Sequence, residues 1–188
     1  MLYTKKGDSG TTKLFSTPSG VRIKKSDPVF AALGGLDELN SSLGFAKALS
    51  QRSGDFLYLN GAHTSYARII ERLQNALFSV QAEIAGSDKR LVQQEVDFAE
   101  LVIAEVETLL PPVTSFVVPG GSETGAYLDV VRTTARHAER SIVKLLDTDR
   151  VPSDIALQFI NHLSSVAYAL ARFANYQEGY SERRPLYQ

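Results

Sequence analysis

Residues 27–46 read DPVFAALGGLDELNSSLGFA, and this stretch has the spacing of a helix with one apolar face. Asp27 can cap such a helix, and Pro28 suits its first turn. The apolar residues that follow recur every three or four positions, at Phe30, Leu33, Leu36, Leu39, Leu43 and Ala46. The pattern therefore predicts an amphipathic helix over about 28–50.

Four further stretches repeat this periodicity along the chain. They predict helices over about 65–85, 93–110, 122–146 and 152–178. Residues 54–61 are expected to be a simple connection, and no repeat or domain linker is visible. Long amphipathic helices with short connections favour an all-α five-helix bundle. We expect one domain over 1–188, with an arm at 1–25, a bundle at 26–178 and an irregular tail at 179–188.

The composition excludes several classes of protein. The chain has 188 residues, a formal net charge of −1 and no Cys, so disulfides, thiolate metal sites and a cysteine nucleophile are excluded. The balanced charge argues against nucleic acid or an anionic membrane as a partner. No apolar run approaches the roughly 18–20 residues of a spanning helix, and the N-terminus turns polar at once. We therefore expect a soluble, cytoplasmic protein.

The arm is basic and rich in turn-forming residues. Residues 3–13 read YTKKGDSGTTK, with β-prone pieces expected at 2–4 and 13–15. Glycines that free the backbone, hydroxyl donors and lysines are the components of a triphosphate site. Lys25, just before the first helix, could join it. The alternative is a solvated surface hairpin.

The fourth predicted helix carries a row of cations. Arg132, Arg136 and Arg140 fall within about 80° of one another on a helical projection, with Asp129 and Glu139 nearby. The row is a candidate clamp for a polyphosphate or for carboxylates of another chain, and the alternative is an exposed face neutralised by Asp129 and Glu139. The opposite face is expected to be buried and comprises Val130, Val131, Thr134, Ala135, Ala138, Ile142, Leu145 and Leu146.

Two polar residues interrupt helices that are otherwise mostly apolar. Asp37 lies in the first helix and needs a partner, which Arg132 or Arg136 could supply. Asn161 lies in the fifth helix and is either a ligand-binding amide or a satisfied packing amide. The three histidines, His63, His137 and His162, lack the spacing of metal ligands, and no Gly-x-Ser-x-Gly motif supports a serine hydrolase.

Five motifs together resemble one family, the PduO-type ATP:cob(I)alamin adenosyltransferases. They are YTKKGDSGTT at 3–12, GLDELNS at 35–41, FVVPGGS at 116–122, Arg132 followed by RHAER at 136–140, and NHLS at 161–164. The resemblance covers nearly the whole chain in order. It implies transfer of the 5′-deoxyadenosyl group from ATP to cob(I)alamin, which yields adenosylcobalamin and inorganic triphosphate. It also implies a homotrimer with ATP and corrinoid bound at each subunit interface.

The resemblance assigns roles to individual residues. Phe116 would fill the lower face of cobalt, Asp37 and Arg132 would form an intersubunit ion pair near the corrinoid, and Tyr187 would close over it. Asn161 would help to hold the Mg²⁺–triphosphate. The implied catalytic set is Arg136, Asp37, Arg132 and Phe116, and the implied ATP contacts are Thr4, Lys5, Lys6, Gly7, Thr12, Lys13, Lys25, Arg136, Glu139, Arg140 and Asn161.

The chain departs from the family pattern at His137, His162, Ser165 and residues 79–86. The resemblance implies that these changes bear on the strength of corrinoid binding and on the ion pairs between subunits, and that the ATP motif is intact. A flavoprotein reductant and an adenosylcobalamin-dependent mutase or dehydratase are the implied partners. Two alternatives to the enzyme remain. One is a non-catalytic carrier or sensor that binds ATP and corrinoid and delivers adenosylcobalamin to a partner mutase, and the other is a purely structural helical bundle.

Overall fold

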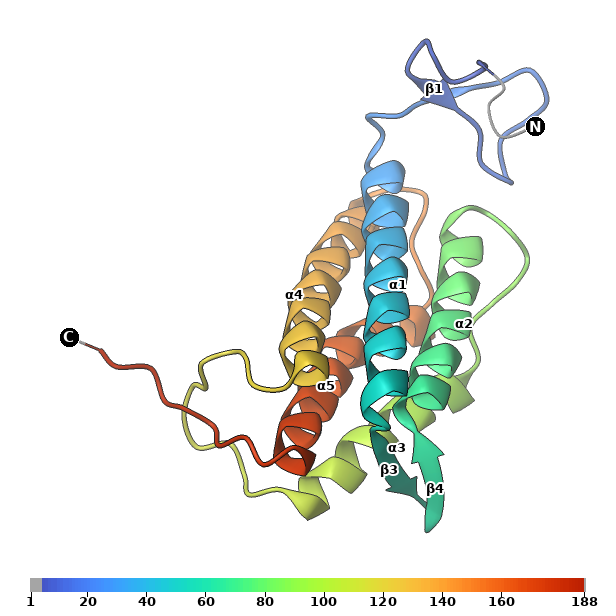
Figure 1. Ribbon diagram of the computed structural model, residues 1–188. Coiled ribbons are helices and arrows are strands. Elements are labelled where there is room, and N and C mark those ends of the chain that lie inside the picture. The colour runs from blue at the N-terminus through green and yellow to red at the C-terminus, as the bar shows by residue number, and fades with distance from the viewer. Residues whose placement is uncertain (1–4, 188) are drawn as a thin grey trace.

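The computed structural model describes residues 5–187, and its helices pack side by side as a bundle (Figure 1). A short 3₁₀ turn, η1 at Lys144–Asp147, continues the fourth helix. The five-helix prediction is confirmed, with every boundary within a few residues of the expected one. The helices are α1 Pro28–Ser53, α2 Tyr66–Ile84, α3 Gln93–Leu109, α4 Glu123–Val143 and α5 Asp154–Gln177.

Polar side chains begin four of these helices. The Asp27 carboxylate accepts a hydrogen bond from the backbone N–H of Val29 at 3.0 Å, as the Asp-Pro pair predicts. Ser65, Ser122 and Ser153 cap α2, α4 and α5 in the same way. These caps satisfy amide groups that the first helical turn leaves unpaired.

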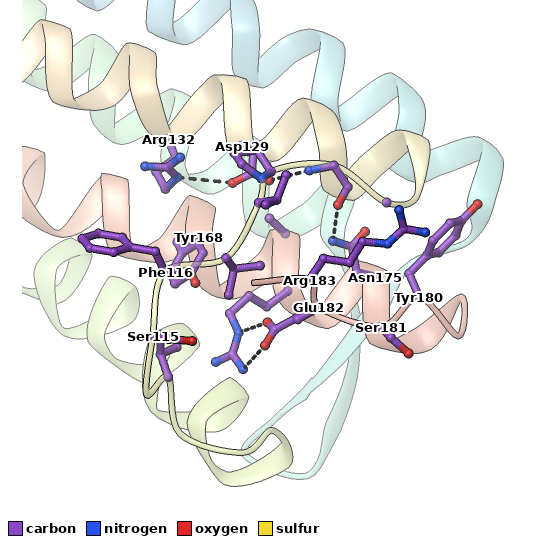
Figure 2. Close-up of a pocket in the computed structure, with 18 of the residues that line it drawn as sticks. Ser115, Phe116, Asp129, Arg132, Tyr168, Asn175, Tyr180, Ser181, Glu182 and Arg183 are labelled. Atoms are coloured by element: carbon purple, nitrogen blue, oxygen red, sulfur yellow. Dashed lines mark hydrogen bonds and ion pairs between the residues drawn. The ribbon is translucent and has the colours of Figure 1, made fainter. Parts of the chain in front are cut away.

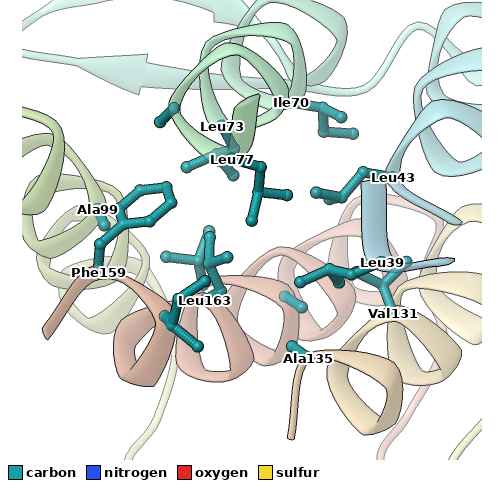
Figure 3. Close-up of a cluster of buried hydrophobic side chains, with 14 of the residues drawn as sticks. Leu39, Leu43, Ile70, Leu73, Leu77, Ala99, Val131, Ala135, Phe159 and Leu163 are labelled. Carbon is teal, nitrogen blue, oxygen red and sulfur yellow. The ribbon is translucent and has the colours of Figure 1, made fainter. Parts of the chain in front are cut away.

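The core lies where the apolar faces of the helices meet (Figure 3). α5 packs against both α3 and α4, and α1 packs against α2 and α4. A Cβ added at Gly35 of α1 would lie 3.4 Å from the Cα of Ala138 on α4, so these two helices cross with their backbones close together. Each helix contributes to the buried cluster, which includes Leu39, Leu43, Ile70, Leu73, Leu77, Ala99, Val131, Ala135, Phe159 and Leu163.

Two residues expected in the core of α4 are on the surface instead. Val130 is 46% exposed and Leu146, in η1, is 43% exposed. α4 packs mainly on α1 and α5, so its buried stripe is narrower than the apolar pattern predicts and the other side of the helix stays exposed. The expected burial of Val130 and Leu146 is therefore wrong for the single chain.

A β-hairpin occupies the segment where only a connection is expected. β3 (Phe56–Leu59) pairs antiparallel with β4 (Ala62–Ser65), and Tyr58 lies opposite His63. Asn60 and Gly61 join the strands with φ angles of 50° and 78°. Left-handed conformations at both turn positions are typical of a two-residue hairpin loop, for which Asn-Gly is a preferred sequence.

The arm folds at the end of the bundle where α1 begins (Figure 1). β1 (Thr11–Thr12) pairs antiparallel with β2 (Ile23–Lys24). The expected extended piece at 13–15 is wrong, because the N–H of Leu14 bonds instead to the Thr17 hydroxyl at 2.9 Å and closes a local turn. The piece expected at 2–4 lies outside the described residues.

The C-terminal tail docks on the loop between α3 and α4. It has no helix or strand over 179–187, as expected. The Val118 N–H nevertheless donates to the carbonyl of Arg183 at 2.8 Å, and Glu182 pairs with Arg172 of α5.

No helix within residues 5–187 has the length and apolar character needed to cross a lipid bilayer.

Candidate functional site

A cavity of about 980 Å³ (Figure 2) is walled by segments at the end of the bundle opposite the arm (Figure 1). Its walls are the α3–α4 loop at 113–121, the first turns of α4, the last turns of α5 and the C-terminal tail. Segments far apart in sequence therefore meet here. The cavity is the right size for a large ligand.

Two of the predicted site residues line this cavity. Phe116 is carried by the α3–α4 loop, and its side chain is 80% exposed. Arg132 enters from α4, with its guanidinium carbon 5.8 Å from the centroid of the Tyr168 ring. An exposed phenyl group beside a cationic wall offers both an apolar surface and an anion-binding group.

The carboxylate of Asp129 joins two walls of the cavity, and the residue is only 9% exposed. One carboxylate oxygen pairs with Nε of Arg132 at 3.3 Å, and the other accepts the N–H of Gly120 at 3.3 Å. This carboxylate therefore joins the loop that carries Phe116 to the helix that carries Arg132.

Tyr168 forms part of the same wall. Burial raises the pKa of its hydroxyl above the ordinary value, and Arg172 partly opposes that effect. The hydroxyl therefore remains protonated at neutral pH, and the ring acts as an apolar and hydrogen-bonding surface. Tyr168, Arg172 and Asn175 line the cavity although the sequence patterns did not single them out.

The aromatic residue of the tail that lines the cavity is Tyr180. Tyr187 is 81% exposed and lies outside the lining. In the single chain, the tail thus brings a different aromatic residue to the cavity from the one expected, and closure by Tyr187 stays a prediction.

The other two arginines of α4 point to solvent. Arg136 and Arg140 are exposed, and neither forms an ion pair within the described part of the chain. The alternative prediction, an exposed face neutralised by Asp129 and Glu139, is therefore wrong for Arg136 and Arg140. It holds only for Arg132, which pairs with Asp129. The row leads from the cavity toward the arm over about 12 Å, at about 1.5 Å per residue.

The arm presents a second cluster of cations. Lys5, Lys6, Lys13 and Lys25 are exposed around the tight turns of residues 5–10, where Gly10 N–H bonds to the carbonyl of Gly7 at 3.1 Å. The amine of Lys25 lies 3.2 Å from the position of a Cβ on Gly7. Thr12 is half-buried in β1, and Thr4 lies outside the described residues.

Arg22 organises the arm, and the motif analysis missed it. Its guanidinium donates to the backbone carbonyls of Lys6 and Thr11, and its Nε donates to the Thr11 hydroxyl at 2.8 Å. The only signal in the sequence was one more cation in a basic segment. Its role depends on carbonyl groups 11 and 16 positions upstream, which no local pattern reveals.

Asp37 and Asn161 are both exposed. Asp37 therefore needs no partner inside the chain, and an interpretation of Asn161 as a packing amide is wrong.

His162, by contrast, has a partner inside the chain, because its ring nitrogen Nε2 lies 3.2 Å from a carboxylate oxygen of Glu100 on α3. That departure from the family pattern faces α3. His137 and Ser165 are exposed on α4 and α5.

Phe116 and Arg132 thus lie at the cavity, the lysines lie on the arm at the other end of the bundle, and α4 carries Arg136 and Arg140 between them. Across residues 5–187, no three acidic or histidine side chains gather in a cluster that could hold a metal ion. The arrangement can bind a large apolar ligand at one end and polyanionic groups along α4 and the arm. It provides cations and surfaces that can position a ligand.

Comparison with known proteins defines the class to which this arrangement belongs. The sequence matches the family model for cobalamin adenosyltransferases over residues 2–174. The chain therefore belongs to the cobalamin adenosyltransferase family.

Relatives and solved structures agree with this assignment. The chain is 33% identical over 178 residues to corrinoid adenosyltransferase PduO of Citrobacter freundii, covering 91% of this chain and 49% of that protein. It is 33% identical over 192 residues to corrinoid adenosyltransferase MMAB of Homo sapiens, covering 97% of this chain and 72% of that one. The chain spans about half the length of the PduO relatives it matches.

The fold matches a variant PduO-type ATP:corrinoid adenosyltransferase from Lactobacillus reuteri, complexed with cobalamin and ATP. The TM-score is 0.85 at 31% identity, over 98% of this chain and 96% of that one. A second variant of the same enzyme, complexed with ATP, gives a TM-score of 0.82 at 32% identity over 98% of this chain and 100% of that one. The family resemblance seen in the motifs is thereby confirmed.

Proposed function

We propose that this chain transfers the 5′-deoxyadenosyl group of ATP to cob(I)alamin and releases inorganic triphosphate. The observation that carries the proposal is the placement of Phe116 and Arg132 in one large cavity, from which two exposed arginines of α4 lead toward the basic arm. A corrinoid would occupy the cavity, and the triphosphate of ATP would lie along the arginines.

The reaction needs little covalent chemistry from the protein. The Co(I) electron pair forms the bond to C5′ of ATP, and the C5′–O bond breaks with its electrons going to the triphosphate. No proton has to move. The residues therefore act by holding the reactants in line and by stabilising charge on the leaving group. Arg136, Arg140 and the arm lysines supply that charge, and Glu139 contacts the nucleotide beside them.

Mg²⁺ fits this site as a companion of the triphosphate. The exposed Asn161 offers an amide oxygen of the type that Mg²⁺ accepts, and phosphate oxygens would supply the other ligands. Bound Mg²⁺ would neutralise charge on the leaving triphosphate.

Phe116 has the properties required to exclude a ligand from cobalt. Its exposed, apolar ring offers no lone pair, so it can occupy the lower axial side of the corrinoid without coordinating it. Cobalt that lacks a lower ligand is easier to reduce to Co(I). We assign Phe116 to this role.

In a homotrimer with a binding site at each subunit interface, residues of a neighbouring copy would complete the site. Phe45, Val130 and Leu146 are large apolar residues that stay exposed on α1, α4 and η1 in the single chain, and Asp37 is available on α1 to pair with Arg132 of a neighbouring copy. We extend the proposal to a cytoplasmic enzyme that receives electrons from a flavoprotein and serves an adenosylcobalamin-dependent mutase or dehydratase.

An anaerobic assay with chemically reduced cob(I)alamin, ATP and Mg²⁺ tests the activity. The expected result is conversion of cob(I)alamin to adenosylcobalamin, measured from the absorption spectrum of the corrinoid. One triphosphate should be released for each corrinoid converted. A folded protein that binds ATP and yields no adenosylcobalamin would overturn the proposed enzymatic activity. It would favour the alternative of a non-catalytic protein that binds ATP and corrinoid and delivers adenosylcobalamin to a partner.

A further inference from the structure

The loop that carries Phe116 is held at its C-terminal end by one side chain of α5. The Asn175 amide donates to the carbonyl of Gly120 at 2.9 Å. Its oxygen accepts the N–H of Ser122 at 2.8 Å and the Ser122 hydroxyl at 3.1 Å. Because Ser122 also caps α4, Asn175 fixes the end of the loop and the start of α4 together.

Two glycines make room for this amide. A Cβ added at Gly121 would lie 2.4 Å from the Asn175 Oδ1, and one added at Gly125 would lie 2.1 Å from it. Atoms cannot approach that closely, so a side chain at either position would displace the amide. The sequence around the N-terminus of α4 is thus fitted to Asn175.

The same helix holds the other end of the loop. Arg172 donates from Nη2 to the carbonyl of Pro111 at 2.9 Å, and its fork also pairs with Glu182 of the tail. Arg172 and Asn175 lie three positions apart and therefore share a face of α5. Both residues line the cavity, and Figure 2 labels Asn175 there.

Phe116 sits between these two attachments. Packing around its largely exposed ring fixes it little, so the backbone must determine where the ring stands. We propose that Asn175 and Arg172 are positioning residues that set the place of Phe116 in the cavity by anchoring both ends of its loop. The inference rests on the proposed function for its catalytic consequence, while the anchoring itself can be measured independently.

The test compares Asn175→Ala with a matched control, Asn75→Ala. Asn75 is exposed on α2, and within residues 5–187 its side-chain amide bonds only to the carbonyl of Glu71 in its own helix. The first readout is turnover from two starting states of the corrinoid. Displacing Phe116 should lower turnover from cob(II)alamin with a reducing system by about tenfold or more. Turnover from cob(I)alamin should fall by less, and ATP affinity at the arm should be unchanged.

The second readout does not depend on activity. The Val118 and Gly120 amides bond to Arg183 and Asp129 rather than to Asn175, so their hydrogen exchange reports the loop indirectly. Exchange at both should accelerate in Asn175→Ala and remain at the wild-type rate in Asn75→Ala. Arg172→Lys, which loses the guanidinium fork, should change both readouts in the same direction.

The outcomes separate the two proposals. An inactive wild-type protein whose loop amides respond to Asn175→Ala would overturn the proposed function and leave the anchor standing. Unchanged exchange at both amides would overturn the anchor. Equal losses of turnover from the two corrinoid states would overturn its action through Phe116. If Asn175→Ala does not fold, Asn175→Asp replaces it, because it keeps the acceptor for Ser122 and loses the donor to Gly120.

Discussion

Replacing Arg136 with Ala should slow adenosyl transfer without weakening the fold. Arg136 is exposed on α4 and has no ion-pair partner among the described residues. Surface changes of this kind alter the free energy of unfolding by about 0.5 kcal/mol or less, and Ala favours the helix. Loss of one charge-assisted contact to the leaving triphosphate should cost about 3 kcal/mol in the transition state, or roughly a hundredfold in kcat.

Arg132 provides an informative contrast on the same helix. Among the described residues, Arg132→Ala would leave the nearly buried Asp129 with only the Gly120 N–H as a partner. The change should therefore also lower the free energy of unfolding by about 1–3 kcal/mol. Thermal unfolding and steady-state kinetics on both variants would separate the effects. Arg68→Ala, at an exposed position on α2, is the control. Normal kcat in a folded Arg136→Ala protein, or an equal loss in Arg68→Ala, would refute the reasoning.

Three further changes test other parts of the molecule. Asp37→Asn should raise the KM for corrinoid more than the Kd for ATP, and equal losses in kinetics and calorimetry would count against an ion pair near the corrinoid. Arg22→Ala removes the donors that hold the carbonyls of Lys6 and Thr11, so ATP affinity measured by calorimetry should fall about tenfold; unchanged affinity would show that the arm binds without this support. Phe159→Ala in the core should lower the free energy of unfolding by about 3–5 kcal/mol in urea titration, and a loss below about 1 kcal/mol would contradict its central place.

The sequence predicted the helices well because each has its own local signals. Apolar periodicity, serine caps and the Asp27-Pro28 pair act within a few residues of where they are read. The hairpin at 56–65 could also have been found, since Asn60-Gly61 between two strand-like segments is a strong turn signal. The arm was harder, because β1 and β2 are two residues each and depend on Arg22 for support.

The site was predicted only where a motif marked it. Phe116 and Arg132 were recognised through the family resemblance, and both line the cavity. Asn175 carried no signal, because its partners lie 53 and 55 positions upstream. Val130 was misplaced for a related reason, since periodicity shows that a residue is apolar and does not show which neighbour covers it.

The arginine row on α4 has a consequence for the choice of nucleotide. Arg132, Arg136 and Arg140 stand four residues apart on one continuous helix, so about 6 Å separates each from the next along the axis. Regular helical geometry fixes these intervals, and no loop rearrangement can shorten them. Arg132 already pairs with Asp129. In the proposed site, a phosphate chain long enough to bridge Arg136 and Arg140 can neutralise both, whereas a shorter one must leave one of these two arginines unmatched. Affinity should therefore decrease in steps from ATP to ADP to AMP, so the length of the phosphate chain becomes a basis of selectivity.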